Sequence, residues 1–302
     1  MKGKDLLSIA DLAPDDVKRI IDSAVEMKRQ GTSSVLAGKT LALLFEKPSL
    51  RTRVSFDVAM HQLGGHSLYL SPAEVGLGSR ESISDVARTL SRYVNIIAAR
   101  TFDHVTVQSL AEYATVPVIN ALSDKEHPCQ ALGDLLTIHE KKTVLEGLTI
   151  AFIGDGNNVA SSLLLASALV GVNFKVASPR GYAVPVEVVA LGRSLARGGA
   201  QITLVEQPQE AAEGADVIYT DVWASIGHEA EAEKRRAAFV GYQVDAALLS
   251  QAAADALLMH PLPAHHGEEI ATGLIDSSQS AVFDQAENRL HVQKAILAEL
   301  LG

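Results

Sequence analysis

The chain has 302 residues, of which 47% are apolar and 21% are charged, a composition typical of a globular protein with two domains. Its net charge of −10 argues against a nucleic-acid or acidic-membrane surface, since both need a basic footprint. The chain shows no long apolar run of the kind that spans a membrane, residues 1–11 lack a signal-peptide core, and a single cysteine, Cys129, excludes an intrachain disulfide. We therefore expect a cytoplasmic protein that binds any anionic substrate through local positive charge.

The first part of the chain alternates segments typical of helices and strands. A helix is expected to begin at Pro14, which suits a first helical turn, and Asp15 and Asp16 suit the positive end of its dipole. Further on, apolar runs predict strands at 40–45, 66–70, 95–99 and 116–121, and amphipathic runs predict helices at 51–63, 83–93, 105–113 and 130–141. This alternation is typical of a mainly parallel sheet with helices on both faces.

A second series of strands follows the boundary segment 141–147. These strands are expected at 148–153, 173–177, 201–205, 216–220 and 256–260. A final helix is expected at 290–301, where apolar residues share one face. The pattern predicts an α/β fold with two domains, residues 1–141 and 142–285, each a mainly parallel sheet flanked by helices.

Segment 45–53 lies where a predicted strand ends and a helix begins, and it carries Ser49, Arg51, Thr52 and Arg53. Helix N-termini present unpaired backbone N–H groups and about half a positive charge, to which hydroxyl and guanidinium groups add directed donors. The segment therefore predicts an anion site of the kind that binds phosphate. A capped helix with a solvated basic face is the alternative, because short motifs have many chance matches.

Three more polar segments follow predicted strands. They are His127-Pro128-Cys129-Gln130, the segment 221–227, and His260-Pro261-Leu262-Pro263. Together with segment 45–53 they resemble the transcarbamylase (aspartate/ornithine carbamoyltransferase) family, its ornithine branch more than its aspartate branch. The resemblance covers essentially the whole chain, and it is specific in combination although each tetrapeptide alone is weak.

The resemblance implies an enzyme that transfers the carbamoyl group of carbamoyl phosphate to the side-chain amine of L-ornithine, giving L-citrulline and phosphate. Residues 1–141 would form the carbamoyl phosphate-binding domain, to which a C-terminal helix at 286–302 returns, and residues 142–285 would bind the amino acid. The family also implies a homotrimer. Because carbamoyl phosphate is a reactive mixed anhydride, the transfer needs alignment, anion neutralisation and an unprotonated amine, and we expect no metal or organic cofactor.

The resemblance also implies a role for individual residues. The expected carbamoyl phosphate ligands are Ser49, Leu50, Arg51, Thr52, Arg100, His127, Gln130, Pro261, Leu262 and Arg289, and the expected ornithine ligands are Asn158, Asp221, Ser225 and Ile226. The residues expected to act in catalysis are Arg51, Thr52, Arg100, His127, Gln130 and Asp221. Arg51 and Arg100 would neutralise the phosphate, and Thr52 and His127 would polarise the carbonyl. Gln130, with a carbonyl of Pro261 or Leu262, would hold the carbamoyl NH2.

On local sequence alone, several of these residues have plainer interpretations. His127 could simply cap the helix that follows it, and Arg100 could form a surface ion pair. Arg289 could be a solvated charge at a helix start. Cys129 is expected to be a small packing residue, because nothing in the sequence indicates a lowered thiol pKa and the reaction needs no thiolate.

Several positions depart from the ornithine branch. Leu50 replaces a usual Thr, Gly76 a Gln, Ile226 a Met, Pro261 a Cys and His266 an Arg. The aspartate branch also has His-Pro-Leu-Pro, but Asp221 supplies the carboxylate that a cationic amino acid requires, which favours ornithine. The alternatives left open are a related acceptor (putrescine, an N-acylated ornithine or aspartate) and a non-catalytic phosphate-binding relative.

The segment 154–159 also resembles a dinucleotide-binding turn, because it has two glycines between a strand and a helix. The third glycine position holds Val159, and Ala177-Ser178-Pro179 after the next strand lacks the carboxylate that would bind a ribose hydroxyl. A dehydrogenase that binds a nicotinamide dinucleotide is therefore disfavoured.

Overall fold

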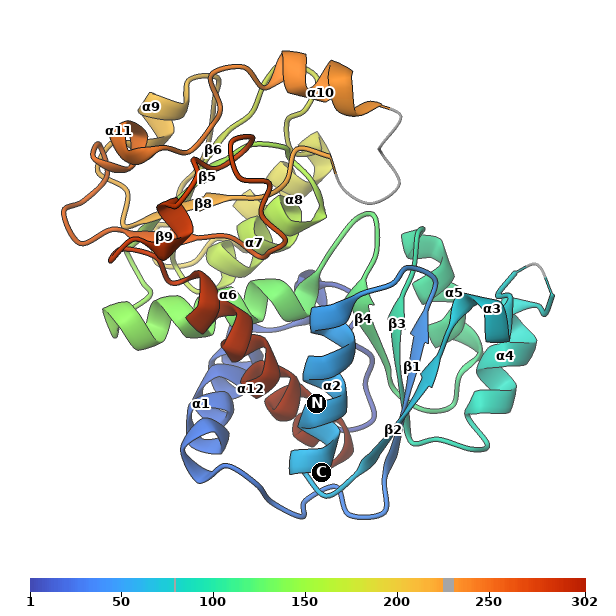
Figure 1. The fold of residues 1–302 in the computed structure, drawn as a ribbon. Coiled ribbons are helices and arrows are strands. Elements are labelled where there is room, and N and C mark those ends of the chain that lie inside the picture. Colours follow the sequence, from blue (N-terminus) through green and yellow to red (C-terminus); the bar gives the residue numbers. More distant parts are fainter. Residues whose placement is uncertain (79, 225–230) are drawn as a thin grey trace. The chain divides into compact units, whose positions relative to one another are not determined.

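Two units, each built on its own parallel sheet, make up the chain in a computed structural model that describes residues 1–78, 80–224 and 231–302 (Figure 1). Unit 1 comprises Met1–Leu136 and Asn288–Gly302, and unit 2 comprises Thr137–Glu287. The chain passes from one to the other within helix α6 (Pro128–Lys142). The division predicted after residue 141 lies further along the same helix.

Unit 1 holds a four-stranded parallel sheet in the order β2-β1-β3-β4. The strands are β1 (Thr40–Phe45), β2 (His66–Leu70), β3 (Ile96–Arg100) and β4 (Val118–Leu122). The helices are η1 (Ile9–Asp11), α1 (Pro14–Gln30), α2 (Leu50–Gln62), α3 (Pro72–Val75), α4 (Ile83–Leu90) and α5 (His104–Tyr113). In β1 and β3 every second residue, beginning with Ala42 and Ile97, packs with α4 and α5 in one hydrophobic cluster, as the two-residue period of a strand requires.

Unit 2 holds a five-stranded parallel sheet in the order β7-β6-β5-β8-β9. The strands are β5 (Thr149–Ile153), β6 (Asn173–Ala177), β7 (Ile202–Val205), β8 (Val217–Thr220) and β9 (Leu257–Met259). The helices are α7 (Asn158–Leu169), α8 (Val186–Leu195), α9 (Pro208–Ala212), α10 (Ala232–Ala238), α11 (Ala246–Leu249) and η3 (Leu274–Asp276). The expected fold of two parallel-sheet domains flanked by helices is confirmed.

The last helix, α12 (Val282–Leu301), begins well before residue 290, where the sequence predicted its start. Val282 is buried at its start, but the buried residues that follow it, Gln285, Asn288 and Arg289, are polar, so these turns carry no continuous apolar stripe. In unit 1 its Asn288 accepts a hydrogen bond of 2.8 Å from Nζ of Lys28 in α1. The expected return of the C-terminal helix to the first domain is confirmed.

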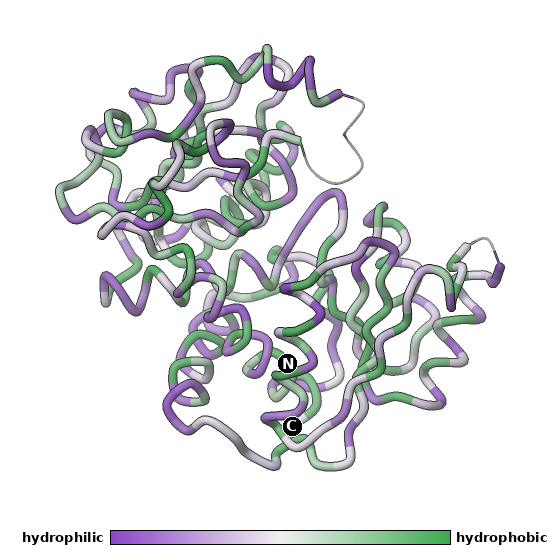
Figure 2. The backbone as a smooth tube through the Cα atoms, in the orientation of Figure 1, coloured by the Kyte–Doolittle hydropathy of each residue, from purple (hydrophilic) through white to green (hydrophobic). Residues whose placement is uncertain are grey.

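The longest helices, α1, α6 and α12, all mix hydrophilic and hydrophobic residues (Figure 2). Within the described parts of the chain, no helix has both the length and the apolar character needed to cross a membrane.

Candidate active site

Unit 1 has a candidate site where its strand order reverses direction. Strands β1 and β3 are neighbours, and Phe45 at the end of β1 pairs in register with Arg100 at the end of β3. The carboxyl ends of parallel strands lie at one edge of the sheet, and at such a reversal the loops diverge and leave room for a ligand. Segment 45–53 and Arg100, which are far apart in the sequence, are therefore brought together.

The start of α2 shows why segment 45–53 forms a helix N-terminus. Ser49 is the N-cap, and its Oγ accepts a hydrogen bond of 3.3 Å from the backbone N–H of Thr52. Thr52 is buried, whereas Leu50 is 75% exposed. Arg53 stacks over the ring of Tyr69, with its guanidinium carbon 3.9 Å from the ring centroid, so that contact accounts for the second arginine of the motif.

Arg289 joins this site from the C-terminal helix. It is buried, and its Nη2 donates a hydrogen bond of 2.8 Å to Oγ1 of Thr52. Gly133 of α6 permits the close approach of α12, since a Cβ added there would lie 3.3 Å from Cγ of Arg289. Because the Thr52 oxygen accepts from Arg289, the Thr52 hydroxyl proton can be donated to another acceptor.

His127 lies beside these arginines and directly before Pro128, the first residue of α6. Burial lowers the pKa of its imidazole well below the usual range, and the positive charges of Arg289 and Arg100 lower it further. At neutral pH the ring is therefore neutral. A neutral imidazole carries one N–H that can donate to a developing negative charge.

Positive charge is crowded at this edge of the sheet. Burial, followed by the charges of Arg289 and Arg51, lowers the pKa of Arg100 to about 10. Burial and Arg100 also lower the pKa of Lys47. Nε of Arg100 is buried and has no hydrogen-bond partner among the residues that the structure describes. A bound anion would satisfy that donor and relieve the repulsion.

Gln130 presents a hydrogen-bond acceptor. Its Nε2 donates a hydrogen bond of 2.8 Å to Oδ1 of Asp134, and because a carboxylate only accepts, this contact fixes which way the amide faces. Its Oε1 is buried with no partner in the described chain. Burial raises the pKa of the neighbouring Cys129 to about 12, in keeping with a packing residue.

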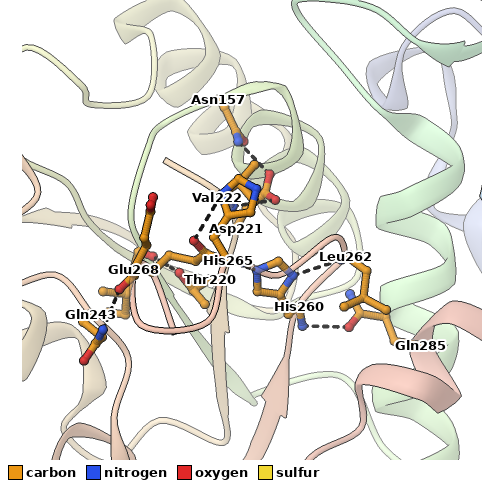
Figure 3. Close-up of polar contacts among 12 residues, drawn as sticks. Asn157, Thr220, Asp221, Val222, Gln243, His260, Leu262, His265, Glu268 and Gln285 are labelled. Atoms are coloured by element: carbon orange, nitrogen blue, oxygen red, sulfur yellow. Dashed lines mark hydrogen bonds and ion pairs between the residues drawn. The ribbon is translucent and has the colours of Figure 1, made fainter. Parts of the chain in front are cut away.

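Unit 2 has a candidate site of its own, at the reversal between β5 and β8. Asp221 directly follows β8, and its carboxylate accepts hydrogen bonds from Nδ2 of Asn157 (2.7 Å) and from the N–H of Val222 (2.8 Å), as Figure 3 shows. Burial raises the pKa of Asp221 above its usual value, against the opposing effect of these hydrogen bonds. A buried carboxylate of this kind attracts a cationic group strongly.

Asn157, which the sequence did not single out, positions this carboxylate. Its Oδ1 caps α7 by accepting from the N–H groups of Val159 (2.9 Å) and Ala160 (3.0 Å), so its NH2 faces Asp221. The predicted ligand Asn158 is the next residue and begins the helix. An asparagine between a glycine turn and a helix is a typical N-cap, which is the signal that could have identified Asn157.

The glycine turn before α7 is filled by the chain itself. Gly156 donates from its N–H to the Tyr182 carbonyl at 2.7 Å, and an added Cβ would lie only 2.1 Å from the backbone nitrogen of Val184. A dinucleotide fingerprint uses such a glycine to let a pyrophosphate approach the backbone. Here the glycine admits a neighbouring loop, which argues against the dinucleotide interpretation.

The turn 260–263 follows β9 in unit 2. His260 is buried, and its Nδ1 accepts a hydrogen bond of 2.9 Å from the N–H of Leu262. Pro261 is buried between them. The two remaining expected ornithine ligands, Ser225 and Ile226, lie outside the described residues.

One cluster in the described residues could offer metal ligands, since donor atoms of His265, Glu268 and Glu269 lie within 4.8 Å of one another. Glu268 already forms an ion pair of 2.9 Å with Nε of Arg236. Oε1 of Glu269 accepts from Nε2 of His260 at 3.0 Å. Glu268 and Oε1 of Glu269 thus have protein partners, whereas Oε2 of Glu269 is buried without a hydrogen-bond partner among the described residues and lies 4.0 Å from Nδ1 of His265.

Comparison with known proteins identifies both halves of the chain. Residues 4–140 match the family model "Aspartate/ornithine carbamoyltransferase, carbamoyl-P binding domain", and residues 146–300 match "Aspartate/ornithine carbamoyltransferase, Asp/Orn binding domain". The chain is 52% identical to the ornithine carbamoyltransferase of Anoxybacillus flavithermus over 306 residues, which is 100% of this chain and 98% of that protein. It is 50% identical to the "Ornithine carbamoyltransferase, anabolic" of Pyrococcus furiosus, over 100% of this chain and 98% of that one.

A solved structure agrees with these matches. The ornithine carbamoyltransferase from Pyrococcus furiosus superposes with a TM-score of 0.96 at 50% sequence identity, covering 100% of this chain and 98% of that chain. The similarity therefore extends over both units.

Proposed function

This chain belongs to the aspartate/ornithine carbamoyltransferase family, and we propose that it transfers the carbamoyl group of carbamoyl phosphate to the side-chain amine of L-ornithine. The products are L-citrulline and phosphate, and the reaction serves arginine biosynthesis, as the name of the anabolic relative suggests. The observation that carries the proposal is the cluster of Arg51, Arg100 and Arg289 beside a neutral His127.

The arginines act on the phosphate. As the bond between the carbonyl carbon and the phosphate oxygen breaks, negative charge builds on the leaving group, and Arg51, Arg100 and Arg289 neutralise it. N–H groups at the start of α2, capped by Ser49, and the backbone of Leu50 complete this end of the site. Each charged contact contributes about 2 to 4 kcal/mol in the transition state, or roughly 30- to 1000-fold in rate.

The carbonyl is polarised by neutral donors. The Thr52 hydroxyl, whose oxygen accepts from Arg289, donates to the carbonyl oxygen together with the N–H of His127. The acceptor Oε1 of Gln130 takes a hydrogen bond from the carbamoyl NH2, and the backbone carbonyls of Pro261 and Leu262 take the other. A proline still has its C=O, so it can serve here.

Asp221 acts at the acceptor end. The side-chain amine of ornithine has a pKa near that of lysine, about 10.4, so at neutral pH about one molecule in a thousand is unprotonated. Asp221 binds the amine, and its raised pKa makes it a better proton acceptor than an exposed aspartate. Asn158 faces the α-amino and carboxylate end of ornithine, and Ser225 and Ile226 complete the pocket.

Every bond formed and broken in the transfer is accounted for without a cofactor. The neutral amine attacks the carbonyl carbon, a tetrahedral intermediate forms, and the bond to phosphate breaks. The nitrogen then loses a proton, which the departing phosphate accepts. We propose no metal or organic cofactor, a cytoplasmic location and a homotrimer. Sedimentation equilibrium checks the last point, with an expected mass near three times that of the 32.0 kDa chain.

A turnover assay tests the function. Carbamoyl phosphate is offered with ornithine, putrescine, N-acetylornithine, lysine or aspartate, and phosphate release and the carbamoylated product are both measured. We expect ornithine to give the highest kcat/KM, with activity retained in EDTA. A preference for aspartate would overturn the role of Asp221, and a preference for putrescine or N-acetylornithine would assign a related acceptor. No turnover with any amine would favour a non-catalytic phosphate-binding relative.

A further inference from the structure

The turn 260–263 is held by a buried histidine whose two ring nitrogens have different partners. A backbone N–H can only donate, so Nδ1 of His260, which accepts from Leu262 at 2.9 Å, carries no proton. Nε2 must then carry the ring proton, and it donates to Oε1 of Glu269 at 3.0 Å. The contacts at both nitrogens therefore fix the tautomer of His260, and Figure 3 shows the one to Leu262.

Peptide planarity extends this contact to a carbonyl. The N–H of Leu262 and the C=O of Pro261 belong to the same peptide unit, which is planar and trans, so the two groups point in opposite directions. Fixing the N–H against the imidazole therefore fixes the direction of the Pro261 carbonyl, away from His260. Leu262 has φ of +58°, a conformation in which a leucine side chain crowds its own backbone, so the turn needs such a contact to hold it.

From this geometry we propose that His260 is a positioning residue that aims the Pro261 carbonyl at the carbamoyl NH2, with Glu269 holding the imidazole in the required tautomer. The proposal rests on the proposed function, in which that carbonyl binds carbamoyl phosphate. His260 and Glu269 are both fully buried, and their hydrogen bonds are to the turn and to each other, which suits a role that acts through the turn.

Other contacts prevent the histidine from moving. The backbone N–H of His260 donates to Oε1 of Gln285 at 2.9 Å, and Nε2 of Gln285 donates to the hydroxyl of Tyr219 at 3.0 Å. Oε1 of Glu269 also accepts from the N–H of His265 at 2.6 Å. The imidazole is thus anchored through its backbone and through its far nitrogen, which leaves Nδ1 to set the turn.

Proline at position 261 suits this arrangement. A proline has no N–H. Of the two residues Pro261 and Leu262, therefore, only Leu262 has a backbone N–H that can donate to His260. Its ring also restricts φ at position 261, which reduces the number of directions in which its carbonyl can face. The departure from the usual cysteine therefore supports a site that relies on the backbone at this position.

Two matched variants test the contacts of the two His260 ring nitrogens one at a time. In His260→Asn the side-chain oxygen can take the place of Nδ1, so the contact to Leu262 is kept and the one to Glu269 is lost. In His260→Gln the amide reaches toward the place of Nε2, so the contact to Glu269 is kept and the one to Leu262 is lost. We expect kcat/KM for carbamoyl phosphate to be at least about fivefold lower in His260→Gln than in His260→Asn, at similar Tm.

Glu269→Gln is the conservative variant of the second residue. A glutamine keeps an oxygen that can accept from Nε2 of His260, so we expect a smaller loss of kcat/KM than in Glu269→Leu, which has no acceptor. Equal losses in the Asn and Gln variants of His260, or wild-type kinetics in both, would overturn the proposal.

A measurement on the wild-type protein needs no turnover. Nitrogen NMR of labelled histidine should show Nδ1 of His260 unprotonated and Nε2 protonated, and the Leu262 amide should exchange slowly with solvent. A proton on Nδ1 would refute the positioning role even if the variants failed to fold. This result is separate from the proposed function, which fails only if the wild-type protein does not carbamoylate ornithine.

Discussion

Arg289 donates a hydrogen bond of 2.8 Å to the hydroxyl of Thr52, 237 residues earlier in the chain. The contact ties the C-terminal helix to the start of α2, and it places a buried guanidinium beside the segment that resembles a phosphate site. The same arginine contributes to the lowered pKa values of Arg100 and His127. One residue therefore links the positive charge, the neutral histidine and the hydroxyl donor.

Replacement of Arg51 by alanine should impair catalysis without unfolding the protein. We expect kcat/KM for carbamoyl phosphate to fall at least about tenfold, because a charged contact to the leaving phosphate is lost. Arg51→Lys should restore little, since an ammonium lacks the forked geometry of a guanidinium. Arg53→Ala is the matched control: Arg53 stacks on Tyr69, so its loss should leave kcat/KM within about twofold. Equal losses at both positions would remove the special role of Arg51.

The charge of Arg100 should lower the Tm of the ligand-free protein and increase the rise in Tm that a bound anion produces. Burial and two neighbouring arginines lower the pKa of Arg100 to about 10, so its positive charge is disfavoured unless an anion compensates it. We expect Arg100→Met to raise Tm slightly in buffer and to remove most of the increase in Tm that inorganic phosphate or carbamoyl phosphate produces. Thermal melts with and without each anion measure both effects. A wild-type ligand shift in Arg100→Met would show that the anion binds elsewhere.

His127 should make the protein less stable in mild acid. In the folded protein the pKa of His127 lies well below its value in the unfolded chain, which is about 6.5. Below pH 6.5 the unfolded state therefore binds a proton at this residue that the native state does not bind. The free energy of unfolding should therefore fall as pH decreases from 6.5, by up to about 1.4 kcal/mol per pH unit from this residue. His127→Asn should flatten that slope in urea unfolding measured between pH 7.5 and 5.5. Parallel slopes would show that His127 is not held neutral.

Much of the fold can be predicted from the sequence because several strands, such as β1, β3 and β5, are apolar runs that are buried along most of their length. Strands β1 (Thr40–Phe45) and β2 (His66–Leu70) occur where they were predicted, since polar or glycine-containing segments bound each apolar run. The start of α12 could not be predicted in the same way. Its first turns are buried through Asn288 and Arg289, and hydrophobic periodicity does not detect polar residues that are buried for binding or hydrogen bonding.

The site was predictable where a motif and a helix start coincide. Local sequence indicates Ser49, Arg51 and Thr52 as an anion site, but it gives no reason to place Arg289 with them, because that contact depends on how α12 packs. Local sequence does not distinguish Asn157 from Asn158 for a similar reason. Asn157 is the residue that caps α7, and the cap directs its amide toward Asp221.

The pair formed by Asn157 and Asp221 gives a test of the acceptor end. Asn157→Ser should keep the cap of α7, because serine is also a good N-cap, but the shorter side chain cannot reach the Asp221 carboxylate. We expect the free energy of unfolding to stay within about 1 kcal/mol of the wild-type value. The KM for ornithine should rise at least about fivefold while the KM for carbamoyl phosphate stays nearly unchanged.

Asp221→Asn is the stronger variant of the same test. Because the pKa of Asp221 is raised on folding, the protein becomes less stable as pH rises from about 3.8 through the folded pKa, and the ionised carboxylate remains a cost at neutral pH. An asparagine removes that cost, so Asp221→Asn should unfold at a higher urea concentration at pH 7 than the wild-type protein. It should also lose at least about a hundredfold in kcat/KM for ornithine, because the amine loses both its counter-charge and its proton acceptor. Kinetics and urea unfolding on one preparation measure both. A variant that is less stable and equally active would contradict the assignment of Asp221 as a functional carboxylate.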